Sequence, residues 1–382
     1  MERLQNVNSN RILWCCDDRG VSVDQLFADL HISASTLEKV LEDEAALTFN
    51  QLRKIAEFFG RGILFFLDAG PVDEARVHSP QFRTLANQKL DLSPKTKGLI
   101  ERAEKQRDVY ISLLEELDAE DMLDFQPPIL DPGDPIKAAR QTREWLELDD
   151  INDFKSYRSA IENRGILVFK TNGYAGKWQI SKENPILGFS LYDDRCPLIV
   201  VKKLDAEVRQ SFTLAHELGH LLLHKASSID EELDLLSRSG QEREANQFAG
   251  HLLVPDEFLL KISDKERPVH AYEFDYWLEE YRKAWGVSSE VILLRLLDEK
   301  RLERDSYLDY RAWRDNQRWE TKEGGNRDYR HREPRHIFGD GYVKTVLDAL
   351  SSRQITLTKA SSYLDGLKVQ DMHRLEALYA GR

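Results

Sequence analysis

Cysteine is scarce in this chain, with only three residues, Cys15, Cys16 and Cys196, among 382. Adjacent cysteines such as Cys15 and Cys16 rarely bridge, and an odd total argues against a disulfide framework. Because no cysteine lies in a CxxC pair, the sequence also excludes a thiolate zinc site of the usual spacing. We expect all three to be small buried hydrophobic residues.

Long apolar runs and an excess of basic residues are also missing. No stretch approaches the roughly 20 apolar residues that span a bilayer, and the first residues, MERLQNVNSNR, lack the apolar core of a secretory signal. We therefore predict a cytoplasmic protein without a membrane partner. The net charge of −13 disfavours sequence-independent binding of nucleic acid. A specific DNA-binding module inside an acidic chain stays open.

The length allows two or three domains, and the pattern predicts a mainly α fold with a small β-sheet, in the α+β class. The proline-rich string DFQPPILDPGDP marks the expected main boundary, because its prolines block helix and strand continuation. We expect four segments: a helix-turn-helix-like bundle at 1–70, a connector and a helix at 71–125, an α+β domain at 126–310, and an Arg-rich loop with C-terminal helices at 311–382.

Hydrophobic periodicity places the individual elements. Helices are expected at 22–29, 35–41, 52–60, 96–118, 136–148, 153–165, 205–223, 241–253 and 273–299 and within 340–380, and strands at 166–170, 186–192 and 196–203. Candidate N-caps of the first helices are Asp24, Ser33 and Thr48, and Gly60 is a candidate stop. The Arg-rich stretch 311–336 is expected to be a solvated loop, with contact to nucleic acid or a target as the alternative.

The string FTLAHELGHLLLH contains an HExxH motif, with His216, Glu217 and His220 at its fixed positions. Residues four apart on a helix point to one side, so both imidazoles can reach one zinc ion. Glu217 would lie beside that ion, where it can take a proton from the attacking water. The motif alone also fits a purely structural pair of histidines.

A third ligand must come from elsewhere in the chain. An HExxHxxGxxH site needs glycine and histidine where the chain has Leu223 and Ala226, so that class is excluded. His224 lies about 12 Å along the helix axis from His216, and it is expected to support the site or cap the helix rather than to ligate.

The later helix QEREANQFAGHLLVP offers a carboxylate. We predict Glu242 as the third ligand and Asn246, four residues on, as support for an imidazole. Glu244 on another face is the weaker candidate ligand, and solvated surface carboxylates are the alternative interpretation. Three protein ligands leave a position for water, which predicts amide hydrolysis with Zn²⁺ as cofactor. Zinc is preferred over manganese or iron from the ligand types.

These two strings together resemble the ImmA/IrrE family of metallopeptidases. The resemblance covers about 130–300 and implies a zincin-like domain in which His216, His220 and Glu242 hold zinc and Glu217 is catalytic. AWGVSSEVILLRLLDE also resembles a family element beyond the active site. The chain departs from the family at Lys202-Lys203, where members often have an asparagine.

The N-terminal string ISASTLEKVLEDEAALTFNQLRKIAEFFG resembles the Xre-like helix-turn-helix of longer members. Glu42 is retained, but Asp43 and Glu44 stand where a basic residue and glycine are usual. Lys39 is the one base of the expected recognition helix, which makes direct DNA contact weak. DNA binding through residues 10–67 and a protein-interaction or homodimerisation module are both open.

The family resemblance implies a regulatory protease whose partner is a repressor, a transcription factor or a toxin. The competing hypotheses are a DNA-binding regulator or antitoxin with an idle zinc site, and a zinc hydrolase acting on something other than peptides. A donor that stabilises the transition state is also expected, with unranked candidates His251, His270, Tyr272 and Tyr276.

Overall fold

The chain forms two compact units in the computed structural model, residues 1–105 and 106–382. This division differs from the four segments expected from the sequence. The structure describes residues 3–42, 44–73, 85, 88, 92–119, 121, 125–172, 176–204, 206–232, 234, 237, 239–317 and 327–381. Among the helices so described, none has both the length and the apolar character needed to cross a bilayer.

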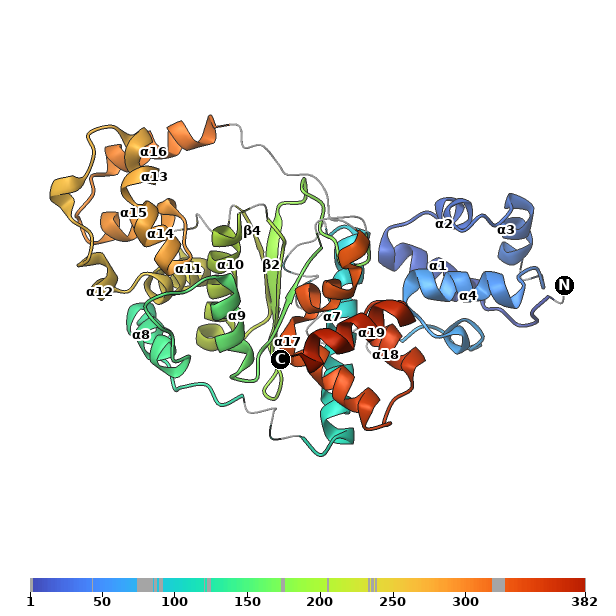
Figure 1. Cartoon of the computed structure of the whole chain (residues 1–382). Helices are drawn as coiled ribbons and strands as arrows, with labels where there is room; N and C mark the ends of the chain where they lie inside the picture. Colours follow the sequence, from blue (N-terminus) through green and yellow to red (C-terminus); the bar gives the residue numbers. More distant parts are fainter. Residues whose placement is uncertain are drawn as a thin grey trace. The chain divides into compact units, whose positions relative to one another are not determined.

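The first unit is a small helical bundle (Figure 1). Its helices are α1 (Ser9–Arg19), α2 (Val23–Asp29), α3 (Ala34–Leu41), α4 (Phe49–Phe59), the 3-10 turn η1 (Ile63–Phe66) and the start of α7 (Pro94–Glu116). Thr48 caps α4 in a reciprocal capping box with Gln51. The prediction for Asp24 was wrong: Ser22 is the N-cap of α2 and accepts a hydrogen bond from the Gln25 amide, which places Asp24 in the first turn.

The cysteines are buried and free, as the sequence predicts. Cys15 and Cys16 belong to the apolar core of the first unit, with Leu26, Leu52 and Phe59. Burial raises the pKa of the Cys15 thiol to about 12. A thiol in this environment stays protonated at neutral pH and acts as a small apolar side chain.

The second unit is built around a four-stranded sheet in the order β1-β3-β2-β4. The strands are β1 (Leu167–Lys170), β2 (Ile186–Leu191), β3 (Leu198–Val201) and β4 (Ser228–Glu231). β1 runs parallel to β3, whereas β2 is antiparallel to both β3 and β4. The first three strands were expected from the sequence, but β4, an edge strand, was not. The fold is thus mainly α with a small mixed sheet, as predicted.

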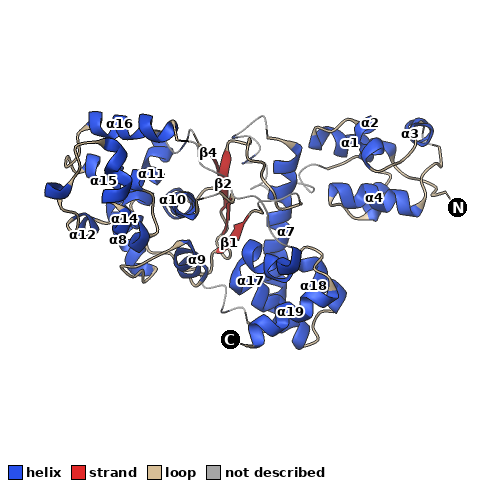
Figure 2. Cartoon of the chain, turned by 45° about the horizontal axis from the view of Figure 1, so that its top comes forward, coloured by secondary structure: helices blue, strands red, loops and turns tan. Residues whose placement is uncertain are grey.

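Helices cover both faces of the sheet, so β1 and β3 are buried throughout (Figures 1 and 2). α10 (Glu207–Gly219) packs on β2 and β3, and α17 (Glu333–Ser351) packs on β1. The other helices of the unit are α8 (Pro135–Trp145), α9 (Phe154–Glu162), α11 (Gly240–Leu253), α12 (Asp256–Leu259), α13 (Phe274–Trp277), α14 (Glu279–Trp285), α15 (Ser289–Asp298), α16 (Arg304–Asp315), α18 (Leu357–Tyr363) and α19 (Val369–Ala380).

Two stretches differ from the sequence expectation. The single helix expected at 273–299 is three helices. Leu278 separates α13 from α14, and Gly286 ends α14 in a left-handed conformation with φ of 63°. The loop expected at 311–336 is partly helical: α16 continues to Asp315, a 3-10 turn spans Arg327–Arg332, and α17 begins at Glu333. Residues 318–326 of that stretch lie outside the described residues.

A buried arginine holds α17 where that helix is interrupted. Gly339 breaks the helix with φ of 85° and ψ of 174°, a region open essentially to glycine alone. The guanidinium of Arg158 donates to the freed carbonyls of His336 and Ile337 at 3.0 and 3.1 Å and to Glu162 at 2.9 Å. A Cβ built on Gly339 would lie 2.8 Å from the Glu162 Cδ. The interruption therefore needs glycine.

We expect Gly339→Ala to lower the free energy of unfolding by about 3 kcal/mol or more, from backbone strain and the clash with Glu162. Gly341→Ala, two residues along the same helix, is the matched control because its Cβ would meet nothing within 4 Å. The control should stay within about 1 kcal/mol of wild type. Thermal or urea unfolding measures both, and equal effects of the two substitutions would contradict this role of Gly339.

Candidate metal centre

The two motif histidines lie side by side in the second unit. α10 ends at Gly219, and the helix continues as a wider π-helical turn, His220–His224. The Nε2 atoms of His216 and His220 lie 3.1 Å apart, and both side chains are buried. Leu214 and Leu218 of the same helix are fully buried in the core, so the packing of α10 fixes where the imidazoles point.

α11 brings Glu242 to the same place. The two helices pack closely because α10 has glycine at the crossing: a Cβ on Gly219 would lie 3.3 Å from the Ala245 Cα. The Oε2 atom of Glu242 lies 3.3 Å from His216 Nε2 and 3.5 Å from His220 Nε2. The predicted set His216, His220 and Glu242 is therefore brought together by two helices.

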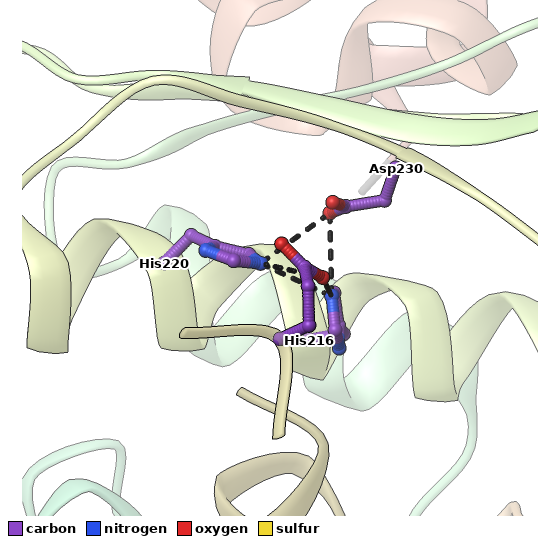
Figure 3. A group of neighbouring side chains, drawn as sticks. His216, His220 and Asp230 are labelled. Carbon is purple, nitrogen blue, oxygen red and sulfur yellow. Dashed lines mark hydrogen bonds and ion pairs between the residues drawn. The ribbon is translucent and has the colours of Figure 1, made fainter. Parts of the chain in front are cut away.

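The structure adds Asp230, which the sequence reasoning missed. Its Oδ2 atom lies 3.3 Å from His216 Nε2 and 3.7 Å from His220 Nε2, and the residue is 1% exposed. Figure 3 shows the two imidazoles and this carboxylate turned toward one another. The one signal in the sequence was a polar–apolar alternation in SSID. Asp230 is also the first residue of the acid-rich string DEELD, in which a single aspartate is inconspicuous.

The four side chains fit a metal ion. Their ligand atoms lie within 4.8 Å of one another, and the five histidine-to-neighbour separations run from 3.1 to 3.7 Å. Ligands of a tetrahedral zinc ion lie about 3.3–3.6 Å apart, given bonds of about 2.0–2.2 Å. The buried Asp230 Oδ2 and Glu242 Oε2 atoms make no regular hydrogen bond and face the imidazole Nε2 atoms. Imidazole and carboxylate donors of this kind suit zinc.

The charges of the site also call for a cation. Burial alone lowers the pKa of His216, but the carboxylates of Asp230 and Glu242 outweigh it and raise that pKa to about 9. Burial raises the pKa of Glu242, but His216 and His220 reverse this and lower it to about 2. The protein alone thus holds a proton between imidazole and carboxylates, and a metal ion would displace that proton.

Glu217 lies beside the cluster and is fully buried. Neither of its carboxylate oxygens has a hydrogen-bond partner. Burial, and then the nearby Asp230, raise the pKa of Glu217 well above its usual value. Space for this carboxylate comes from Gly188 on β2, where a Cβ would lie 2.8 Å from Glu217 Oε1. A buried carboxyl group with a raised pKa, next to a possible metal, can accept and return a proton.

A second layer of side chains orients His220. The Nδ1 atoms of His220 and His224 lie 3.1 Å apart, and His224 Nε2 lies 3.0 Å from a carboxylate oxygen of Glu244. Burial, and then His220, lower the pKa of His224, so its ring is neutral. A neutral His224 that donates to Glu244 accepts at Nδ1 from His220, which leaves the His220 Nε2 lone pair facing the cluster. His224 therefore lies between His220 and Glu244, in contact with both.

Asn246 lies elsewhere than expected. Its amide donates to the backbone carbonyls of Asp234 and Ser237, at 3.1 and 3.5 Å, rather than to an imidazole. The structure therefore corrects the prediction that Asn246 supports an imidazole. Asn246 lies one helical turn beyond Glu242 and faces the backbone of Asp234 and Ser237.

The candidates for a transition-state donor also make their contacts away from the cluster. His251 Nδ1 lies 3.7 Å from Asp256, the ring of His270 stacks on Tyr272, and Tyr276 is exposed. Nothing in these contacts ranks one candidate above the others.

Comparison with known proteins agrees with this geometry. No curated protein matches the chain. Residues 162–297, which carry all the side chains of the site, match the model of the peptidase M78 family, described as the IrrE N-terminal-like domain. This segment is therefore similar to the IrrE N-terminal-like domain, and the match supports a metallopeptidase-type function.

Proposed function

We propose that the protein is a zinc-dependent endopeptidase of regulatory type, which cleaves a specific protein such as a repressor or a transcription factor. The observation that carries this proposal is the convergence of His216, His220 and Glu242 on one point, with the buried carboxyl of Glu217 beside it. Bound zinc would polarise the peptide carbonyl and make the attacking water more acidic. His216, His220 and Glu242 would hold it.

The chain's own residues supply the proton transfers. Glu217 accepts the proton of the attacking water and returns it to the leaving nitrogen. The raised pKa of Glu217 suits both roles, because the protonated form is not costly in this buried place. Glu244 and His224 keep His220 in the tautomer that ligates.

Recruitment of the substrate is proposed for the helical first unit. α3, the counterpart of a recognition helix, carries Lys39 as its one basic residue next to the acidic Glu38. This balance favours contact with a protein over contact with DNA phosphates. A homodimer through this unit is a further proposal from the sequence.

Glu217→Gln tests catalysis even while the substrate is unidentified. New protein N-termini would be compared between cells that make wild type and cells that make the variant, and the zinc content of both purified proteins would be measured. We expect Glu217→Gln to keep zinc and to lower the yield of the new N-termini by about 10²–10⁴-fold. Glu207→Gln, at the exposed start of the same helix, should behave as wild type.

Identical N-termini from wild type and Glu217→Gln would remove the peptidase proposal. One observation then favours a second candidate, a DNA-binding regulator or antitoxin with a non-catalytic zinc site. Asp230 makes four protein donors available, and four donors are typical of closed structural zinc sites. A gel shift with the DNA upstream of the gene would test that function directly.

A further inference from the structure

The fourth donor of the cluster, Asp230, lies beside a distortion of the sheet. Asp230 faces Gly188 of β2, but the next pair along is Glu231 with Ile186, so the register shifts by one residue between them. Such a bulge in an antiparallel pair turns a side chain to a new direction. Here the extra residue is Leu187 of β2, and it lies opposite the step from Asp230 to Glu231 on the edge strand.

The carboxylate of Asp230 is held in a set orientation. Residues two apart on a strand share a face, and the hydroxyl of Ser228 donates to Asp230 Oδ1 at 3.1 Å. The other oxygen, Oδ2, makes no regular hydrogen bond and faces His216 Nε2 at 3.3 Å, although the residue is 1% exposed. A charged carboxylate buried in this way is costly unless a cation meets it.

The remaining distances show what Asp230 does to the site. Its Oδ2 atom is as close to His216 Nε2, at 3.3 Å, as the Oε2 atom of Glu242 is. These separations match those between ligands of one tetrahedral ion, about 3.3–3.6 Å. Asp230 is therefore placed as a fourth donor around the point where the two imidazoles and Glu242 meet.

We propose that Asp230 is a fourth protein ligand of the metal in the resting protein and blocks the position that the attacking water must take. The inference rests on the proposed function and adds a regulation to it: the enzyme is latent until β4 withdraws Asp230. β4 has four residues and pairs with β2 alone among the described strands, so its movement breaks few hydrogen bonds.

Metal affinity tests the first half of the proposal. The zinc dissociation constant would be measured by competition with a chromophoric chelator for wild type, Asp230→Asn, Asp230→Ala and Glu231→Ala. We expect both Asp230 variants to bind zinc about tenfold or more weakly. Glu231→Ala removes an acid from the same strand whose side chain points to the other face, and should bind zinc as wild type does.

Access to the metal tests the second half. In the cobalt-substituted proteins, acetohydroxamate would be titrated and followed by the visible absorption of the ion. We expect Asp230→Ala to bind acetohydroxamate about tenfold or more tightly than wild type, because its fourth position is open. Asp230→Asn is nearly isosteric with wild type, so it still tests the proposal if Asp230→Ala fails to fold.

The outcomes separate the two proposals. Equal zinc affinity and equal acetohydroxamate binding in wild type and both Asp230 variants would overturn the role of Asp230 and leave the peptidase proposal standing. A wild-type protein that binds neither zinc nor cobalt would remove the proposed function itself.

Discussion

Glu242→Ala is expected to weaken zinc binding by about 10²-fold. Zinc bound by four protein ligands is worth about 12 kcal/mol in small zinc proteins, so one ligand accounts for about 3 kcal/mol. Removing Glu242 also leaves the two imidazoles with Asp230 as their one charged partner in the cluster. Competition with a chelator measures the dissociation constant, and a smaller rise in melting temperature on adding zinc gives an independent check.

Glu244→Ala is the matched control for this prediction. Glu244 lies on the same helix and is likewise partly exposed, but it contacts His224 instead of the cluster. Because it acts on zinc only through His224 and His220, we expect its loss to weaken zinc binding by about tenfold at most. If Glu244→Ala had the larger effect, the ligand would be Glu244, and α11 would present a different face to the histidines in solution.

The part of the site that is local in the sequence could be predicted from it. His216 and His220 face the same way because residues four apart on a helix always do. Glu242 could be proposed because a helix whose small residues allow close packing follows within a short distance. The structure indeed brings its carboxylate within 3.5 Å of both imidazoles. Hydrophobic periodicity also predicted three of the four described strands and the α+β class.

The part that depends on tertiary pairing could not be predicted. Asp230 reaches the cluster because β4 pairs with β2, with a bulge in β2 opposite that residue. Neither the register of a four-residue strand nor the bulge leaves a pattern in the sequence. The predicted role of Asn246 also depended on tertiary contacts. Helical spacing puts Asn246 on the side of Glu242, but its amide donates to the backbone carbonyls of Asp234 and Ser237. The helix-turn-helix character of the first unit stays a prediction.

Gly188→Ala is expected to lower peptidase turnover by about 10²-fold or more while zinc stays bound. The added Cβ would lie 2.8 Å from Glu217 Oε1 and from Thr213 Cγ2, and 3.0 Å from the carbonyl oxygen of Val200. Since that carbonyl is backbone, Glu217 has to move, and a small displacement of a group that transfers protons is costly to the rate. We also expect a loss of about 1–3 kcal/mol in the free energy of unfolding.

The comparison of turnover with zinc affinity decides whether Gly188 acts through Glu217. The three predicted ligands are not among the nearest neighbours of the new Cβ, so the zinc dissociation constant should stay within about threefold of wild type. The double variant Gly188→Ala, Thr213→Ser removes one of the clashing methyl groups and should recover part of the rate. A parallel loss of zinc and turnover in Gly188→Ala would mean that the sheet and α10 separate as a whole. Gly188 would then matter for packing and not for placing the carboxyl group.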